Sequence, residues 1–295
     1  MLRLEHLAEL AACHASDLAV RVEEFDLGGR HFAWNTRPAL MGVINLSPDS
    51  WYRESVVLDP RAALRRGTIL AAQGADLVDV GAESTLPHAD RVTVARQTDR
   101  LVPVIRGLHE RGILVSAETY HPEVAQACLE AGASVLNLTG TDPTESIFRL
   151  AAAFDAGVIL CYVQGENVRE VGALDLRSDP VPLLHDFFAR QIDRATRCGV
   201  RRLLIDPGLG FYYRNLTDGT DRVRHQMAVF LHTFRLRRLG WPVCHALPHA
   251  FESFGDEVRT AEPFFAVLAA LGRTDLFRTH ELPRVRAVLE TLAAF

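Results

Sequence analysis

The stretch Met41-Gly42-Val43-Ile44-Asn45-Leu46-Ser47-Pro48-Asp49-Ser50 joins an apolar run directly to a polar turn. Residues 41–44 predict a buried strand that ends at the carboxamide of Asn45, before Ser47-Pro48-Asp49 turns the chain away. A single stretch of this kind could be any strand that ends in a turn. The pattern recurs along the chain, however, and this recurrence predicts the fold.

Short apolar runs occur at residues 39–45, 77–80, 113–116, 135–138, 158–162, 203–206, 243–246 and 276–278. Segments with helical spacing lie between them, and Asp59-Pro60 and Gly74 have the residue types that begin and end a helix. Strands buried on both faces and joined by helices form a parallel sheet. Eight such units in about 250 residues predict an α/β fold, a (β/α)8 TIM barrel. An open doubly wound sheet is the alternative, although no G-x-G-x-x-G follows the first strand.

The chain before the barrel has a different pattern. Residues 1–20 are spaced as an amphipathic helix, and two short runs flank Gly28-Gly29 as in a β-hairpin. We therefore expect residues 1–38 to form a helix and a hairpin packed on a barrel of residues 39–295.

Composition limits the classes of partner. The chain has 295 residues, of which 48% are hydrophobic, and a net charge of −5, which argues against broad nucleic-acid binding. No apolar run approaches the ~18 residues of a membrane span. The five cysteines form no C-x-x-C pair. They predict a reducing, cytoplasmic compartment and neither a disulfide framework nor a zinc site.

All 32 basic residues are arginine, so the chain contains no lysine. Codon bias explains such a composition, but the chemical consequence holds whatever the cause. A Schiff-base lysine and the lysine of a phosphate-binding P-loop are both excluded.

Active sites of barrels lie where the strands end. Groups able to hydrogen-bond or ionise occupy these ends: Asn45, Asp79 with Glu83, Glu118, Asn137, Tyr162 with Gln164, Asp206, His245, and Arg278 with His280. Carboxylates and carboxamides suit a ligand rich in N–H donors, and arginine suits an anion or a flat ring. The plainer alternatives are a turn aspartate at Asp206 and a packed or exposed histidine at His280.

Several of these residues lie in longer motifs. The stretches 41–50, 74–85, 205–211 and 278–280 strongly resemble motifs of the dihydropteroate synthase family, in order, and 115–120 and 136–137 match weaker ones. The resemblance runs from about residue 22 to the C-terminus. It implies a pterin-binding barrel that joins a dihydropterin methyl pyrophosphate to 4-aminobenzoate and releases pyrophosphate with the help of Mg²⁺.

The resemblance also implies roles for single residues. Asn137 and Asp206 would bind the pterin edge, and Glu118 replaces the aspartate that is usual in the family. Gln164 and Phe211 would line the substrate site.

The remaining roles concern the pyrophosphate. Asn45 would contact Mg²⁺ and pyrophosphate, and Thr85 would lie near the pyrophosphate and the aminobenzoate. Arg278 would stack on the pterin and, with His280, hold the leaving group. Asp206, Arg278 and His280 are therefore the expected catalytic residues.

The chain departs from the family on the acceptor side. Leu86 replaces an arginine, Ala250 stands roughly at the family lysine, and the loop 50–55 lacks the usual glycines. Tyr162 stands where histidine is common. Arg53, His245 and His249 are the candidates to replace the lost charge.

Three functions remain open at this stage. The first is a synthase-like transferase that uses 4-aminobenzoate or a derivative. The second is a pterin-binding carrier, sensor or pathway partner without synthase activity, and the third is a methyl-transfer pterin domain. A homodimer is expected from the resemblance alone.

Overall fold

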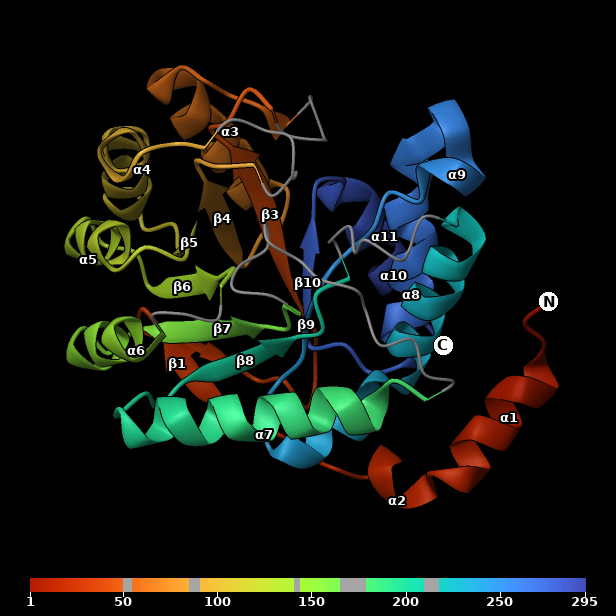
Figure 1. The fold of residues 1–295 in the computed structure, drawn as a ribbon. Coiled ribbons are helices and arrows are strands. Elements are labelled where there is room, and N and C mark those ends of the chain that lie inside the picture. Colours follow the sequence, from red (N-terminus) through yellow and green to blue (C-terminus); the bar gives the residue numbers. More distant parts are fainter. Residues whose placement is uncertain (50–54, 85–90, 141–143, 165–178, 210–217) are drawn as a thin grey trace.

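Eight parallel strands close into a barrel surrounded by helices (Figure 1). The computed structural model describes residues 1–49, 55–84, 91–140, 144–164, 179–209 and 218–295. The strands follow the order β8-β7-β6-β5-β4-β3-β10-β9, and a parallel bridge between Ile205 and Val243 joins the two ends of this series. The predicted barrel is therefore confirmed, and the open doubly wound sheet is excluded.

The barrel strands are β3 (Ala39–Asn45), β4 (Leu77–Gly81), β5 (Val115–Thr119), β6 (Val135–Leu138), β7 (Gly157–Cys161), β8 (Leu203–Asp206), β9 (Cys244–Ala246) and β10 (Leu276–Thr279). The helices are α1 (Leu4–Cys13), α2 (Ala15–Leu18), α3 (Pro60–Ala72), α4 (Val94–His109), α5 (Pro122–Glu130), α6 (Thr144–Ala153), α7 (Val181–Arg197), α8 (Gly219–Leu236), α9 (Phe251–Phe254), α10 (Ala261–Leu271) and α11 (Leu282–Ala293), with short 3-10 turns η2 (Arg237–Leu239) and η3 (Gly255–Thr260). No helix in these described ranges is long and apolar enough to cross a membrane.

Local signals explain most of the element boundaries. The Asp59 carboxylate accepts a hydrogen bond from the Ala62 N–H at 2.9 Å, which caps α3, and Thr93 caps α4 through the Arg96 N–H. Several predicted strands differ from the structure by one residue at an end, and two differences are larger. β5 continues to Thr119 instead of ending at Ser116, and the N-terminal helix breaks at His14 into α1 and α2.

A hairpin of β1 (Phe25–Leu27) and β2 (Arg30–Phe32) closes the barrel at the end where the strands begin. Leu27, Phe32 and Trp34 join one apolar cluster with the early residues of the barrel strands, including Met41 and Leu276. The rings of Phe32 and Trp34 stack with their centroids 4.8 Å apart. One end of the barrel is thus an apolar, packed core, which leaves the opposite end for chemistry.

We predict that Trp34→Ala destabilises the protein strongly. Trp34 is buried in the apolar cluster at the closed end, and removing such a side chain leaves a cavity. The free energy of unfolding should fall by about 3–5 kcal/mol, measured by urea denaturation. The matched control is Phe154→Ala at an exposed aromatic residue, which should change it by less than about 0.5 kcal/mol. Equal effects of the two substitutions would contradict the role of the hairpin in the core.

Candidate active site

Strand alternation places a polar layer directly above the apolar end of the barrel. Side chains two residues apart on a strand share a face. Leu77 and Leu276 point into the barrel, so Asp79 and Arg278, two residues further along the same strands, also point into it. The same rule applies around the barrel. We call the resulting group the interior polar set, and it comprises Asp79, Ser116, Glu118, Asn137, Asp206 and Arg278.

Arg278 lies at the centre of this set. Its Nε donates to Asp79 Oδ2 at 2.7 Å and its Nη2 donates to Glu118 Oε2 at 2.6 Å. Asp79 also accepts hydrogen bonds from Ser116 Oγ at 2.6 Å and from Asn137 Nδ2 at 3.1 Å. Because Asp79 is fully buried, these charge-assisted bonds fix the orientation of both the carboxylate and the guanidinium.

Two carboxyl groups of the set, those of Glu118 and Asp206, have pKa values above the ordinary range. Burial raises the pKa of Glu118 to about 7; Arg278 opposes this shift, whereas Asp79 and Asp206 add to it. Burial also raises the pKa of Asp206 to about 6, against a 2.8 Å hydrogen bond from the Gly208 N–H. Burial by itself would lower the pKa of Arg278, but Asp79 and Glu118 outweigh it, so that the pKa rises and the guanidinium stays charged. The set therefore combines a permanent cation with two carboxyl groups that change protonation close to neutral pH.

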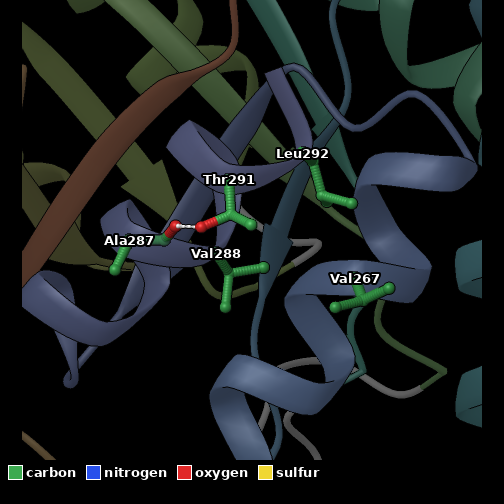
Figure 2. Close-up of a pocket in the computed structure, with 5 residues that line it drawn as sticks. All are labelled: Val267, Ala287, Val288, Thr291 and Leu292. Carbon is green, nitrogen blue, oxygen red and sulfur yellow. Dashed lines mark hydrogen bonds between the residues drawn. The ribbon is translucent and has the colours of Figure 1, made fainter. Parts of the chain in front are cut away.

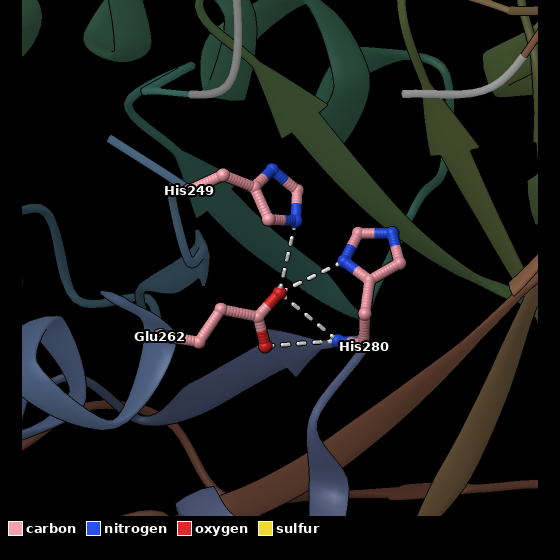
Figure 3. Close-up of side chains that lie close together, drawn as sticks. All are labelled: His249, Glu262 and His280. Atoms are coloured by element: carbon pink, nitrogen blue, oxygen red, sulfur yellow. Dashed lines mark hydrogen bonds and ion pairs between the residues drawn. The ribbon is translucent and has the colours of Figure 1, made fainter. Parts of the chain in front are cut away.

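A second group lies where β9 and β10 end (Figure 3). His280 Nδ1 and the His249 ring approach the same carboxylate oxygen, Glu262 Oε1, at 2.9 and 3.4 Å. Burial tends to raise the pKa of Glu262, but hydrogen bonds from the two histidines outweigh it and hold the pKa well below its ordinary value. Burial lowers the pKa of His280. This group is thus a buried anion shared by two imidazoles.

The chain matches a family model described as "Pterin binding enzyme" over residues 41–249. A dihydropteroate synthase of Streptococcus pyogenes serotype M6 is 34% identical over 209 residues, which cover 70% of this chain and 73% of that protein. The chain belongs to the dihydropteroate synthase family.

Two further relatives show the extent of the match. A probable bifunctional folylpolyglutamate synthase/dihydropteroate synthase of Halobacterium salinarum is 33% identical over 275 residues; the alignment covers 88% of this chain and 31% of that protein. The chain therefore spans about a third of this bifunctional relative. The structure of Xanthomonas albilineans dihydropteroate synthase with 4-aminobenzoic acid has a TM-score of 0.78 and 29% identity, with 93% of this chain and 98% of that chain covered.

The structure brings together four of the residues that the family resemblance selects: Glu118, Asn137, Asp206 and Arg278 all belong to the interior polar set. His280 lies beside this set and contacts Glu262 instead. Thr85 and Phe211, together with Leu86 and the loop 50–54, lie outside the described residues.

Two predicted residues lie at the rim, near the ends of β3 and β7. Asn45 Nδ2 donates to Ser55 Oγ at 2.6 Å. Gln164 Oε1 accepts from the hydroxyl of Tyr162 at 3.4 Å, and the Tyr162 ring packs edge-on against Phe187 of α7. The Tyr162 ring therefore packs against a surrounding helix, at the position where the family resemblance led us to expect histidine.

His245 was expected among the polar strand ends, and this expectation is wrong. The side chain is fully buried, its Nε2 lies 2.8 Å from Thr233 Oγ1 on α8, and its ring packs 4.8 Å from that of Phe230. Because Cys244 points into the barrel, its neighbour on the strand must point outward. His245 cannot replace the family lysine at the mouth.

Sequence reasoning missed three residues of these groups. It named Asp79 only as one polar strand end, and it did not select Ser116 or Glu262. The two-residue alternation along β4 and β5 could have identified Asp79 and Ser116. No sequence signal joins Glu262, in the first turn of α10, to two histidines on other elements.

One groove lies apart from both groups, between α10 and α11 on the outside of the barrel (Figure 2). It encloses about 300 Å³ and is lined by Val267, Ala287, Val288, Thr291 and Leu292. Its one polar side chain, Thr291, donates to the Ala287 carbonyl within α11 at 2.7 Å. The groove offers no charged group to a ligand and is not the active site.

The raised pKa of Glu118 predicts a pH-dependent contribution to stability. In the unfolded chain Glu118 titrates near its ordinary pKa of 4.5, and in the folded protein near 7. Between these values the folded state holds the additional proton, so the contribution is fully present below the lower value and is lost as pH rises through the window. Between pH 5 and pH 8 the wild type should lose more unfolding free energy than Glu118→Gln, by an amount on the order of 2 kcal/mol.

Urea denaturation of both proteins at the two pH values measures this difference. Glu290→Gln, at an exposed glutamate of α11, is the matched control and should follow the wild type. Parallel pH profiles for Glu118→Gln and the wild type would show that burial does not raise this pKa.

Proposed function

We propose that the protein is a dihydropteroate-synthase-like transferase. It would join a dihydropterin methyl pyrophosphate to an arylamine, 4-aminobenzoate or a derivative, and release pyrophosphate, in folate or a related pterin biosynthesis. The observation that carries the proposal is the interior polar set, in which Glu118, Asn137, Asp206 and Arg278 share the open end of a barrel of this family.

The interior polar set suits the edge of a pterin. This edge presents adjacent N–H donors beside a carbonyl, and a carboxylate can accept two parallel N–H bonds while a carboxamide both donates and accepts. Because the pKa values of Glu118 and Asp206 lie near 7 and 6, each carboxyl can bind in the protonation state that the ligand requires. Gln164 and Phe211 are proposed to line the same site.

The pyrophosphate end is proposed to lie toward the rim, at Asn45. The amide nitrogen of Asn45 donates a hydrogen bond to Ser55. The carboxamide oxygen is then the atom proposed to bind the metal. Mg²⁺ prefers oxygen ligands and is commonly held by one or two protein groups with substrate phosphates and water, so this residue fits the ion. When bound, Mg²⁺ neutralises charge on the phosphate oxygens.

The chemical step breaks the C–O bond between the pterin methylene and the pyrophosphate, whose oxygen takes the electron pair. The amine nitrogen forms the new C–N bond and then loses a proton to solvent. Arg278 and His280, with Thr85, are proposed to hold the leaving group. Charge placed beforehand around the departing oxygen lowers the barrier, and the proposed mechanism is therefore mainly electrostatic.

The missing lysine favours a second candidate function. The chain contains no lysine, so if no other residue substitutes for the one implied by the family resemblance, the acceptor side loses a charge-assisted contact worth about 1.5–3 kcal/mol. A protein that binds the pterin but does not condense it, acting as a carrier or sensor, would retain the interior polar set. The two functions differ in turnover and not in pterin affinity.

Two further points are also proposals. A homodimer is expected by resemblance to the synthases. A cytoplasmic location is supported by the five cysteines, all of which are free thiols.

Turnover is tested by incubating the protein with dihydropterin methyl pyrophosphate, Mg²⁺ and 4-aminobenzoate. We expect release of pyrophosphate that depends on the arylamine, measured by a coupled phosphate assay, with the condensed product detected by mass spectrometry. Tight pterin binding without pyrophosphate release, across a panel of arylamines, would favour the carrier or sensor and reject the transferase.

The pterin pocket is tested by Asp206→Asn. Loss of one charged hydrogen-bond acceptor should weaken pterin binding roughly ten- to a hundredfold, measured by calorimetry with a pterin ligand. Asp186→Asn, at an exposed aspartate of α7, is the matched control and should bind as the wild type does. Unchanged affinity in Asp206→Asn would show that the pterin binds elsewhere.

A further inference from the structure

Three side chains from three separate elements converge where β9 and β10 end (Figure 3). His249 follows β9, Glu262 lies in the first turn of α10, and His280 follows β10 directly. Each offers one ligand atom, and the three atoms lie within 4.8 Å of one another. We call these residues the His-Glu-His cluster.

The spacing of these atoms suits a shared cation. A zinc-sized ion binds imidazole nitrogen at ~2.0–2.1 Å and carboxylate oxygen at ~2.0–2.2 Å, so neighbouring ligands around it stand roughly 3.0–3.4 Å apart. Glu262 Oε1 lies 2.9 Å from His280 Nδ1 and 3.4 Å from His249 Nε2. Both contacts act as hydrogen bonds to the Glu262 carboxylate. Two nitrogens therefore approach one oxygen at distances close to those between neighbouring ligands of one ion.

The carboxylate of Glu262 is already held in place by its surroundings. The Thr279 hydroxyl donates to Oε2, and the backbone N–H of Glu281 donates to the same oxygen at 3.1 Å. The backbone N–H of His280 is shared between Oε2, at 3.0 Å, and Oε1, at 3.2 Å. Hydrogen bonds of this kind orient the ligands of metal sites in proteins, and they leave Oε1 directed at the two histidines.

The three side chains of the cluster are largely buried. The Glu262 side chain is 0% exposed, and the side chains of His249 and His280 are 15% and 12% exposed. The Nε2 of His249 is itself buried, so an ion bound there would be largely shielded from water. Three protein ligands are fewer than the four of a typical structural zinc site.

The donor set selects the kind of metal. Imidazole favours zinc and the neighbouring transition metals, whereas Mg²⁺ and Ca²⁺ prefer sites made of oxygen alone. The His-Glu-His cluster is therefore distinct from the Mg²⁺ proposed at Asn45. The cluster contains no cysteine, so the scattered positions of the five cysteines could not have indicated it.

We propose that His249, Glu262 and His280 form a binding site for one divalent transition-metal ion, such as Zn²⁺, at the mouth of the barrel. The ion binds to two imidazole nitrogens and one carboxylate oxygen. It places a fixed positive charge beside the interior polar set, in a chain that has no lysine to supply one.

The test is metal binding by the full-length protein after removal of metals with a chelator. Titration with Zn²⁺ in a calorimeter should give one tight site per chain that excess Mg²⁺ does not occupy. Titration with Co²⁺ should give visible absorption bands from a nitrogen- and oxygen-ligated ion. His249→Ala and His280→Ala, each shown by circular dichroism to be folded, should weaken Zn²⁺ binding at least tenfold.

His31→Ala is the matched control, because His31 also pairs with a carboxylate, that of Asp26 at 2.8 Å, but on the exposed hairpin. It should leave the tight site unchanged. No tight Zn²⁺ site in the wild type, or equal binding by the two cluster variants and the wild type, would overturn the proposal. Since the readout is metal binding and not pyrophosphate release, that result would leave the proposed transferase function untouched.

Discussion

The site depends on one guanidinium buried among three carboxyl groups. Arg278 contacts Asp79 and Glu118 directly, and Asp206 adds to the same field. A buried carboxylate is stable only if it is paired and hydrogen-bonded. One positive charge cannot balance three negative charges. The pKa values of Glu118 and Asp206 are therefore raised, so these two groups hold their protons to higher pH than ordinary carboxyl groups do. A ligand with several N–H donors would supply what the protein lacks.

This polar centre is tolerated because the other end of the barrel is apolar and closed. The same strands that carry Asp79, Asp206 and Arg278 carry Leu77, Leu204 and Leu276 two residues earlier, packed against the hairpin. On each of these strands, the residue that packs in the apolar core and the residue that belongs to the polar site are therefore only two positions apart. The hairpin is needed because a barrel interior without a plug would expose this apolar layer.

The sequence predicts the barrel because strands buried on both faces form apolar runs between helices. The prediction is weakest where the interior is polar. The predicted run 113–116 begins two residues and ends three residues before β5 does, because the continuous apolar residues stop at Val115 whereas the strand continues through Glu118 to Thr119. His245 was assigned to the mouth because strand ends were read without the alternation that turns it toward α8. Glu262 could not be found from sequence, because its partners meet it only through the packing of α10 against the end of β10.

Because the chain has no lysine, positive charge in the site must come from arginine, histidine or a bound cation. A guanidinium has five N–H donors, and the described contacts of Arg278 with Asp79 and Glu118 use two of them. The rest can serve a ligand, but the guanidinium charge is already shared by its two carboxylate partners, which reduces what it offers to a pyrophosphate. An additional cation near the ends of β9 and β10 would add positive charge beside Arg278. On the two proposals above, the carboxylate-rich interior would select the N–H-rich ring, and an ion held by the His-Glu-His cluster would stabilise negative charge that develops at the mouth.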